Sequence, residues 1–189
     1  MLRITLPVTV LAAVLLTGCA TQRSDFYVAN DGSTAQSSGS DVDGDTKGAN
    51  QFPMTWKTHG KRVFVFNPQI NAWAAYDSNG QRVNTGRASG GKDFCPDIGR
   101  GCRTPTGTYR VISKGGAECE SSIFPIETHG GAPMPYCMKF GLYGHAVHGS
   151  NDVPNSNASH GCIRVTPAAA QWLSQNFMQV GTKVIVESY

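Results

Sequence analysis

The chain has 189 residues, a length that suits one folded domain with appended segments. Its 22 glycines, 10 prolines and 15% charged residues favour a turn-rich, strand-rich domain over a helical bundle. The formal net charge is +3 and lysines and arginines form no cluster, which argues against nucleic-acid binding. A mildly basic surface is compatible with an anionic polymer as partner.

The N-terminal residues 1–18 are predicted to be a lipoprotein signal peptide. Arg3 supplies a positive start, and the apolar run from Ile4 to Leu16 is too short to span a bilayer. Leu16-Thr17-Gly18-Cys19 resembles a bacterial lipobox, which implies lipidation of Cys19. We therefore expect a protein of the cell envelope or periplasm, lipid-anchored to a bacterial membrane, with the outer membrane favoured. The alternative is an ordinary secretory signal in which Cys19 is incidental.

Residues 19–51 are predicted to be a flexible tether, and the folded domain is predicted to cover residues 52–189. The stretch SSGSDVDGDTKGAN has few large apolar side chains, so burial cannot offset the entropy lost on ordering it. Within the domain, apolar runs, alternation and turn residues predict strands at 62–66, 72–76, 81–88, 107–114, 136–140, 144–148 and 183–187. The segments 89–106 and 115–135 lack a strand pattern and are predicted to be long loops, which are often functional.

One main helix is predicted at about 167–179. Thr166 is a suitable N-cap and Pro167 suits the first helical position. Ala169, Trp172, Leu173 and Phe177 follow helical spacing and form one apolar face. The elements together predict a mainly β domain with this helix packed against it.

Cysteine count predicts two disulfides. Of the six cysteines, Cys19 is the predicted lipidation site and Cys162 the candidate nucleophile. The four that remain are an even number, which in an exported protein suits disulfide pairing. The remainder is Cys95, Cys102, Cys119 and Cys137. Pairing of sequence neighbours, Cys95–Cys102 and Cys119–Cys137, is favoured among the three connectivities that four cysteines allow. A zinc site is the alternative, and it is disfavoured because no Cys-x-x-Cys pair is present.

The candidate chemistry is concentrated in residues 145–165, which hold three histidines and Cys162. A thiol is mostly protonated at neutral pH and needs a base to become a nucleophile. His148, at the end of a predicted strand, is the candidate base, by proton transfer or as an ion pair. His145 lies three residues earlier, so it is expected on the opposite strand face in a structural role. The alternatives are a structural or disulfide-bonded Cys162 and a metal site formed by the histidines and this thiol.

Residues around the thiol suggest supporting roles. The backbone amides of Gly161 and Cys162 are candidates to stabilise an oxyanion. His160 is expected either to hydrogen-bond the loop or to act directly. Arg164, two residues beyond the thiol, is a candidate partner for a substrate carboxylate.

Three motifs resemble the catalytic domain of the L,D-transpeptidase (YkuD-type) family. They are His148-Gly149-Ser150, Ser159-His160-Gly161-Cys162-Ile163-Arg164, and the upstream Arg103-Thr104-Pro105-Thr106-Gly107-Thr108-Tyr109. The resemblance covers roughly residues 60–187, and the cysteines also resemble a cysteine-rich subgroup of this family. It implies a β-sandwich-like mixed structure with a helix, and no metal or cofactor.

The resemblance also implies a reaction on peptidoglycan stem peptides, and with it a role in wall organisation and cell shape. Cys162 attacks the L-to-D peptide bond of a tetrapeptide stem, D-alanine leaves, and the acyl group passes to an amine of a neighbouring stem in a 3→3 crosslink. His148 is the general base, oriented by the carbonyl of Gly149. His160 and Gly161 shape the oxyanion site, and Ser159 and Arg164 bind substrate. The expected partners are these stems and, through the lipid anchor, a membrane, with no nucleic acid; the chain is expected to be a monomer.

Two further functions remain open at this point. The same scaffold can hydrolyse stems, as an L,D-carboxypeptidase or endopeptidase, if water replaces the amine acceptor. The connection 149–158 is shorter than in many family members, which bears on the acceptor side. A non-catalytic wall-binding lipoprotein is the other alternative, and the presence of both His148 and Cys162 argues against it.

Overall fold

The computed structural model of the protein describes residues 50–141 and 143–189. The predicted signal peptide, Cys19 and nearly all of the predicted tether lie outside these residues. Within the described ranges, no helix combines the length and apolar character needed to cross a bilayer.

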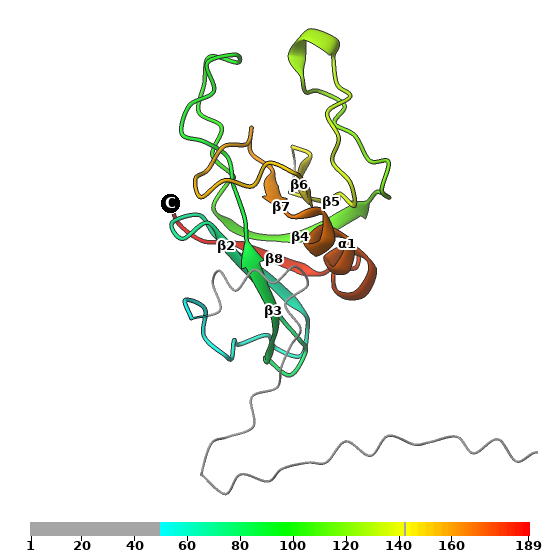
Figure 1. The fold of residues 1–189 in the computed structure, drawn as a ribbon. Helices are drawn as coiled ribbons and strands as arrows, with labels where there is room; N and C mark the ends of the chain where they lie inside the picture. The colour runs from blue at the N-terminus through cyan, green and yellow to red at the C-terminus, as the bar shows by residue number, and fades with distance from the viewer. Residues whose placement is uncertain (1–49, 142) are drawn as a thin grey trace, which may run out of the picture. The chain divides into compact units, whose positions relative to one another are not determined.

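The described residues form eight strands in one sheet, in the order β3-β2-β1-β8-β4-β5-β6-β7. Neighbouring strands are antiparallel except for the β1–β8 and β6–β7 pairs, which are parallel. The strands are β1 (Val63–Asn67), β2 (Ala72–Tyr76), β3 (Arg82–Arg87), β4 (Gly107–Lys114), β5 (Met138–Phe140), β6 (His145–Gly149), β7 (Ile163–Val165) and β8 (Lys183–Val186). The prediction of a mainly β domain with one main helix is therefore confirmed (Figure 1).

The helix begins where its capping residues predict and changes form earlier than expected. The Thr166 hydroxyl accepts a hydrogen bond from the Ala169 amide, and α1 spans Pro167–Trp172. The chain then continues as a π-helix, Leu173–Phe177, instead of as α-helix to about 179. The amide of Met178 bonds to the carbonyl of Leu173, a spacing of five residues. Leu173 and Phe177 in this wider turn and Met178 directly after it are all buried in the main core.

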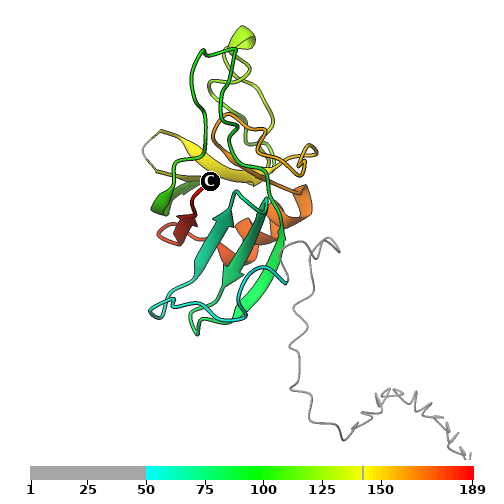
Figure 2. The same ribbon diagram turned by 90° about the vertical axis from the view of Figure 1, so that its left-hand side faces the viewer.

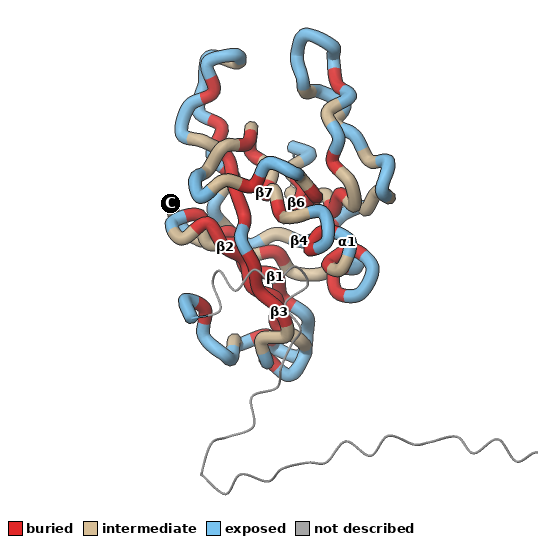
Figure 3. Tube along the Cα trace, in the orientation of Figure 1, coloured by how far each residue is buried: buried red, intermediate tan, exposed pale blue. Residues whose placement is uncertain are grey.

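The main core lies between the sheet and the helix. Aromatic side chains of β1 and β2 (Phe64, Phe66, Trp73) pack with β6–β7 residues and with Leu173 in one buried cluster. Figure 3 shows the central strands as buried and the long connections as largely exposed. A second cluster covers the opposite face of β1 and β2 with Phe52 and Tyr76.

Two long loops rise from the same end of the fold, as both Figure 1 and Figure 2 show. They are residues 89–106 and 115–135, the segments without a strand pattern. The first is closed by the Cys95–Cys102 disulfide, and a second disulfide ties Cys119, in the other loop, to Cys137. These are the pairings that the sequence favoured. A short 3-10 helix, Ile126–Thr128, is the only helical element described within the second loop.

Candidate active site

The parallel pair β6–β7 brings the two halves of the 145–165 segment side by side. Val147 is opposite Ile163 and His148 is opposite Arg164. Val147 and Ile163 point into the main core. Because side chains alternate along a strand, the residues next to them (His148, Cys162 and Arg164) project from the other face of the sheet. All three line one cavity of about 510 Å³.

The hydrogen bond of His148 defines its tautomer. The ring Nδ1 lies 2.9 Å from the carbonyl oxygen of Gly149. A carbonyl can only accept, so Nδ1 carries the proton and, in the neutral ring, Nε2 is left with its lone pair. The side chain is buried, and this burial lowers the pKa of His148 to about 4, with the Gly149 bond opposing and the Arg164 charge adding to the shift.

Cys162 is the one free cysteine among the described residues, and it is half-buried. Its side chain packs against the cluster of Met134, Cys137 and Ala146. Burial raises the pKa of the Cys162 thiol, while a hydrogen bond with the Ala146 backbone and nearby positive charges oppose that rise. With the pKa of His148 lowered and that of Cys162 raised, the resting pair is a thiol and a neutral imidazole at pH 7 rather than an ion pair.

The burial of neutral His148 predicts a loss of stability in acid. The unfolded chain takes up a proton at this ring below about pH 6.5, whereas the folded protein resists until about pH 4. The unfolded state therefore binds more protons in this window, and stability falls as the pH falls through it. A shift from 6.5 to about 4 corresponds to roughly 3 kcal/mol at 1.36 kcal/mol per pH unit.

The measurement is the free energy of unfolding from denaturant titrations at pH 7, 5.5 and 4, for wild type and His148→Gln. We expect the wild type to lose up to roughly 3 kcal/mol more than the variant between pH 7 and 4. The variant keeps every other titrating group, so the difference isolates this ring. Identical pH profiles for the two proteins would show that His148 is not held neutral by the fold.

Ser159 and Gly161 serve the loop that presents the thiol. The Ser159 hydroxyl accepts a hydrogen bond from the Gly161 amide at 3.0 Å and donates one to the Cys162 carbonyl. Ser159 is only 2% exposed. Ser159 lines the cavity, but its hydroxyl is engaged on both sides within the loop, so its predicted substrate-binding role stays a prediction. The Gly161 amide is likewise engaged within the loop, so of the predicted pair only the Cys162 amide remains a candidate to stabilise an oxyanion.

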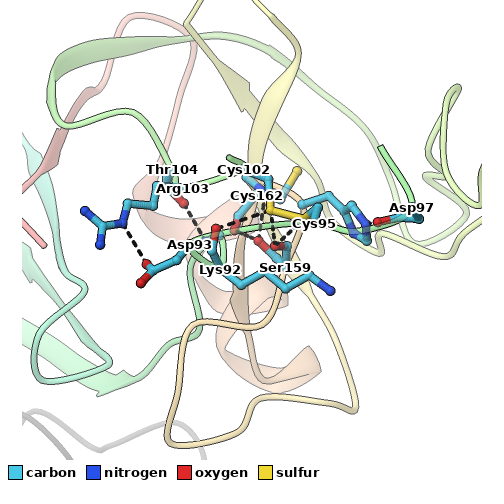
Figure 4. The surroundings of a disulfide bond; sticks show 12 residues. Lys92, Asp93, Cys95, Asp97, Cys102, Arg103, Thr104, Ser159 and Cys162 are labelled. Atoms are coloured by element: carbon cyan, nitrogen blue, oxygen red, sulfur yellow. Dashed lines mark hydrogen bonds and ion pairs between the residues drawn. A yellow bond between two sulfur atoms is a disulfide. The ribbon is translucent and has the colours of Figure 1, made fainter. Parts of the chain in front are cut away.

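The Cys95–Cys102 disulfide lies directly against this loop (Figure 4). Its sulfur atoms are 4.0 Å (Cys95) and 3.7 Å (Cys102) from the Ser159 carbonyl oxygen. Residues 89–92 run beside the same segment: the Lys92 amide donates to the Ser159 carbonyl, and the Ser159 amide donates to the Gly90 carbonyl. At Gly91 a Cβ atom would lie 1.9 Å from the Cys102 carbonyl oxygen, so the close approach requires glycine. The disulfide-closed loop thus forms a rigid support for the thiol-bearing segment.

His160 joins the two long loops. Its Nε2 lies 2.7 Å from an Asp97 carboxylate oxygen, and its ring packs at a tilt of 32° against Phe124, with centroids 4.4 Å apart. The residue lines the cavity wall through contacts that the local sequence does not reveal. Asp97, His160 and Cys95 lie near one another, but the Cys95 sulfur is in a disulfide and has no thiolate to offer a metal.

The positions of Arg164 and His145 add to what the sequence predicted for the site. Arg164 lines the cavity, but its guanidinium already pairs with Asp152 at 2.8 Å. His145 also lines the cavity, although strand parity placed it on the opposite face. It stands at the start of β6, where a Cβ on Gly161 (φ 118°) would lie 2.9 Å from its ring. His145 therefore packs under the thiol loop and is part of the site, contrary to the expectation.

The fold is a β-rich domain in which a buried histidine on β6 and a free thiol directly before β7 line one cavity. A sequence profile of the YkuD family, the L,D-transpeptidase catalytic domain, matches residues 60–186. The chain belongs to this family. No curated protein sequence matches it closely enough to be reported as a relative.

Solved structures agree in fold. The L,D-transpeptidase of Xylanimonas cellulosilytica is 27% identical with a TM-score of 0.59, over 73% of this chain and 66% of that one. An L,D-transpeptidase of Mycobacterium smegmatis is 23% identical with a TM-score of 0.55, and the match covers 68% of this chain and 59% of that one. L,D-transpeptidase 3 of Mycobacterium tuberculosis, solved with a faropenem-derived adduct, is 23% identical with a TM-score of 0.56, over 67% and 60%. The chain thus spans less than two thirds of the length of these structures.

Proposed function

We propose that the protein is a peptidoglycan L,D-transpeptidase in which Cys162 is the nucleophile and His148 the general base. The observation that carries this proposal is the fixed tautomer of His148. Its Nδ1 is held by the Gly149 carbonyl, so the basic Nε2 is available in the cavity that also holds the free thiol. Family membership supplies the class of reaction.

The proposed first step begins from the neutral pair. The thiol proton passes to Nε2 of His148 as Sγ attacks the carbonyl carbon of the L-to-D bond of a tetrapeptide stem. The Gly149 carbonyl stabilises the resulting imidazolium through Nδ1. His148 then gives the proton to the nitrogen of the leaving D-alanine, the C–N bond breaks, and a thioester remains on Cys162.

The second step reverses the proton transfers of the first and breaks the thioester. An amine of a neighbouring stem gives a proton to Nε2 and attacks the thioester, and the thiolate leaves and recovers the proton. The product is a 3→3 crosslink. If water attacks instead, the same residues carry out hydrolysis, as an L,D-carboxypeptidase or endopeptidase.

The test is intact-protein mass spectrometry of the full chain incubated with a synthetic tetrapeptide stem, followed by product analysis. We expect a transient mass gain equal to the stem without D-alanine, located on the peptide that contains Cys162. A product of two joined stems identifies an amine acceptor, and a tripeptide identifies water. Absence of both the adduct and D-alanine release would overturn the proposal in favour of a non-catalytic wall-binding protein.

The N-terminus supports a proposal about location. Leu16-Thr17-Gly18-Cys19 after an apolar run is typical of a lipoprotein processing site. We propose that Cys19 carries the lipid that anchors the domain in the cell envelope, next to its polymeric substrate. Two disulfides in the domain are in keeping with an oxidising compartment.

A further inference from the structure

Lys139 lies on the floor of the cavity, on the same sheet face as the thiol. It is paired with Ala146 in the β5–β6 register. In the parallel β6–β7 pair, Val147 is opposite Ile163. The residues before each of them therefore also lie side by side, which places Ala146 next to Cys162. Its neighbours Met138 and Phe140 point into the core, so Lys139 projects from the opposite face, as Cys162 does. Adjacent strands are about 4.8 Å apart, which puts the backbones of Lys139 and Cys162 roughly 10 Å apart.

The positive charges around the cavity differ in their availability. Four cationic side chains line it: Arg100, Arg103, Lys139 and Arg164. Arg103 pairs with Asp93, and Arg164 pairs with Asp152. Arg100 stands on the exposed rim. The side chain of Lys139 is half-buried, and no hydrogen bond or ion pair joins its ammonium group to another described residue.

A half-buried ammonium without a side-chain partner in the protein is available to an anionic ligand that enters the cavity. One carboxylate, Glu120, lines the cavity, and it is exposed. The cavity floor therefore carries a net positive charge that no protein group neutralises. The charge of Lys139 is close enough to Cys162 to favour its thiolate.

We propose that Lys139 binds the C-terminal carboxylate of the acyl-donor peptide, the one that leaves with the terminal residue. This inference rests on the proposed function, because it places the scissile carbonyl at Cys162. That carboxylate lies one residue beyond the attacked carbonyl, a separation that the flexible lysine stem can bridge from the strand two positions away. Arg164, which the sequence suggested for this role, is already bound to Asp152. Lys139 thus selects peptides that end at the residue after the scissile bond.

The experiment crosses enzyme variants with modified peptides. The variants are Lys139→Met, Lys139→Arg and, as a matched control, Lys61→Met, which removes a lysine from an exposed position outside the cavity. The donors are a tetrapeptide stem with a free C-terminus, its C-terminal amide, and a stem amidated only at its internal carboxylate. Initial rates of release of the terminal residue give kcat and KM for each pair.

For wild type we expect the C-terminal amide to react roughly ten- to hundredfold less efficiently in kcat/KM than the free acid. Lys139→Met should lose the same factor with the free acid, mainly through KM, and nothing further with the amide. Lys139→Arg should recover most of the preference, and Lys61→Met should match wild type. The stem amidated internally should remain as dependent on Lys139 as the unmodified stem.

Equal losses on acid and amide in Lys139→Met would overturn the inference, as would a dependence that follows the internal carboxylate. Failure of the proposed function looks different, because wild type would then release no terminal residue from any donor and form no adduct on Cys162.

Discussion

Cys162→Ala is expected to reduce acyl transfer by at least about 10⁴-fold, to the level of the uncatalysed background. Removing the nucleophile of a covalent mechanism removes the thioester route itself, so residual binding and oxyanion contacts cannot compensate. The other four cysteines of the described residues are in disulfides and cannot replace it. The measurement is the rate of D-alanine release from a tetrapeptide stem.

The matched control is Cys162→Ser, which keeps the shape of the side chain and replaces the thiol by a weaker nucleophile. Both variants should unfold within about 1 kcal/mol of wild type, because Cys162 is half-buried and isosteric or small changes there leave little cavity. A carbapenem-type acylating probe should add its mass to the wild type and to neither variant. Turnover by Cys162→Ala close to the wild-type rate would contradict the assignment.

His148→Gln is expected to lower kcat/KM by about 10²- to 10⁴-fold, the range that a positioned general base contributes. The loss should be large because the resting pair is neutral. The buried thiol has a raised pKa, so little thiolate exists at pH 7 without a base to accept its proton during attack. The rate of the variant should rise with pH up to the thiol pKa, whereas the wild type should show a flatter profile above about pH 5.

Two other histidine variants separate this role from general damage to the site. His145→Gln and His160→Gln change rings that line the same cavity. His160 is held by Asp97 and Phe124, and His145 packs under Gly161, so both should act through loop position with losses of about tenfold or less. Losses in either variant as large as that of His148→Gln, with the same pH profile, would contradict the assignment of the base.

The two disulfides explain how long loops can carry a precise site. Cys162 packs between the Cys95–Cys102 loop, which contacts Ser159, and the Cys137 end of the second bridge. His160 then joins the two loops through Asp97 and Phe124. Each bridge limits the conformations of an otherwise irregular segment. The loops therefore hold the thiol segment in place without strands of their own.

The sequence by itself determined the elements whose signal is local. Apolar runs, alternation and turn residues located the strands from 62–66 to 183–187, because a strand buried on both faces needs a continuous apolar run and a strand buried on one face needs apolar residues at a period of two. Thr166 and Pro167 located the start of the helix, because capping satisfies amides within one turn. The motif around Cys162 indicated the family. The four cysteines left after Cys19 and Cys162 predicted two disulfides between sequence neighbours.

The tertiary structure decided what depends on contacts between distant segments. The helix continues as a π-helix after Trp172, in a segment whose residues Leu173 and Phe177 are packed in the main core. The Ser159 hydroxyl bonds to the Cys162 carbonyl, and the Arg164 guanidinium pairs with Asp152. The spacing of these residues in the sequence does not reveal either contact. His145 lines the cavity and its ring lies close to Gly161, a contact between distant segments that strand parity cannot foresee.

Lys139 shows the same limit most clearly. It is an isolated lysine in the sequence, and only the strand order β5-β6-β7 brings it to the cavity that Cys162 also lines. Chemistry carried by one short motif can be predicted from residue types and spacing, because the motif holds its own geometry. The choice of substrate is made by side chains from several strands and loops, so it is decided only when the sheet has formed.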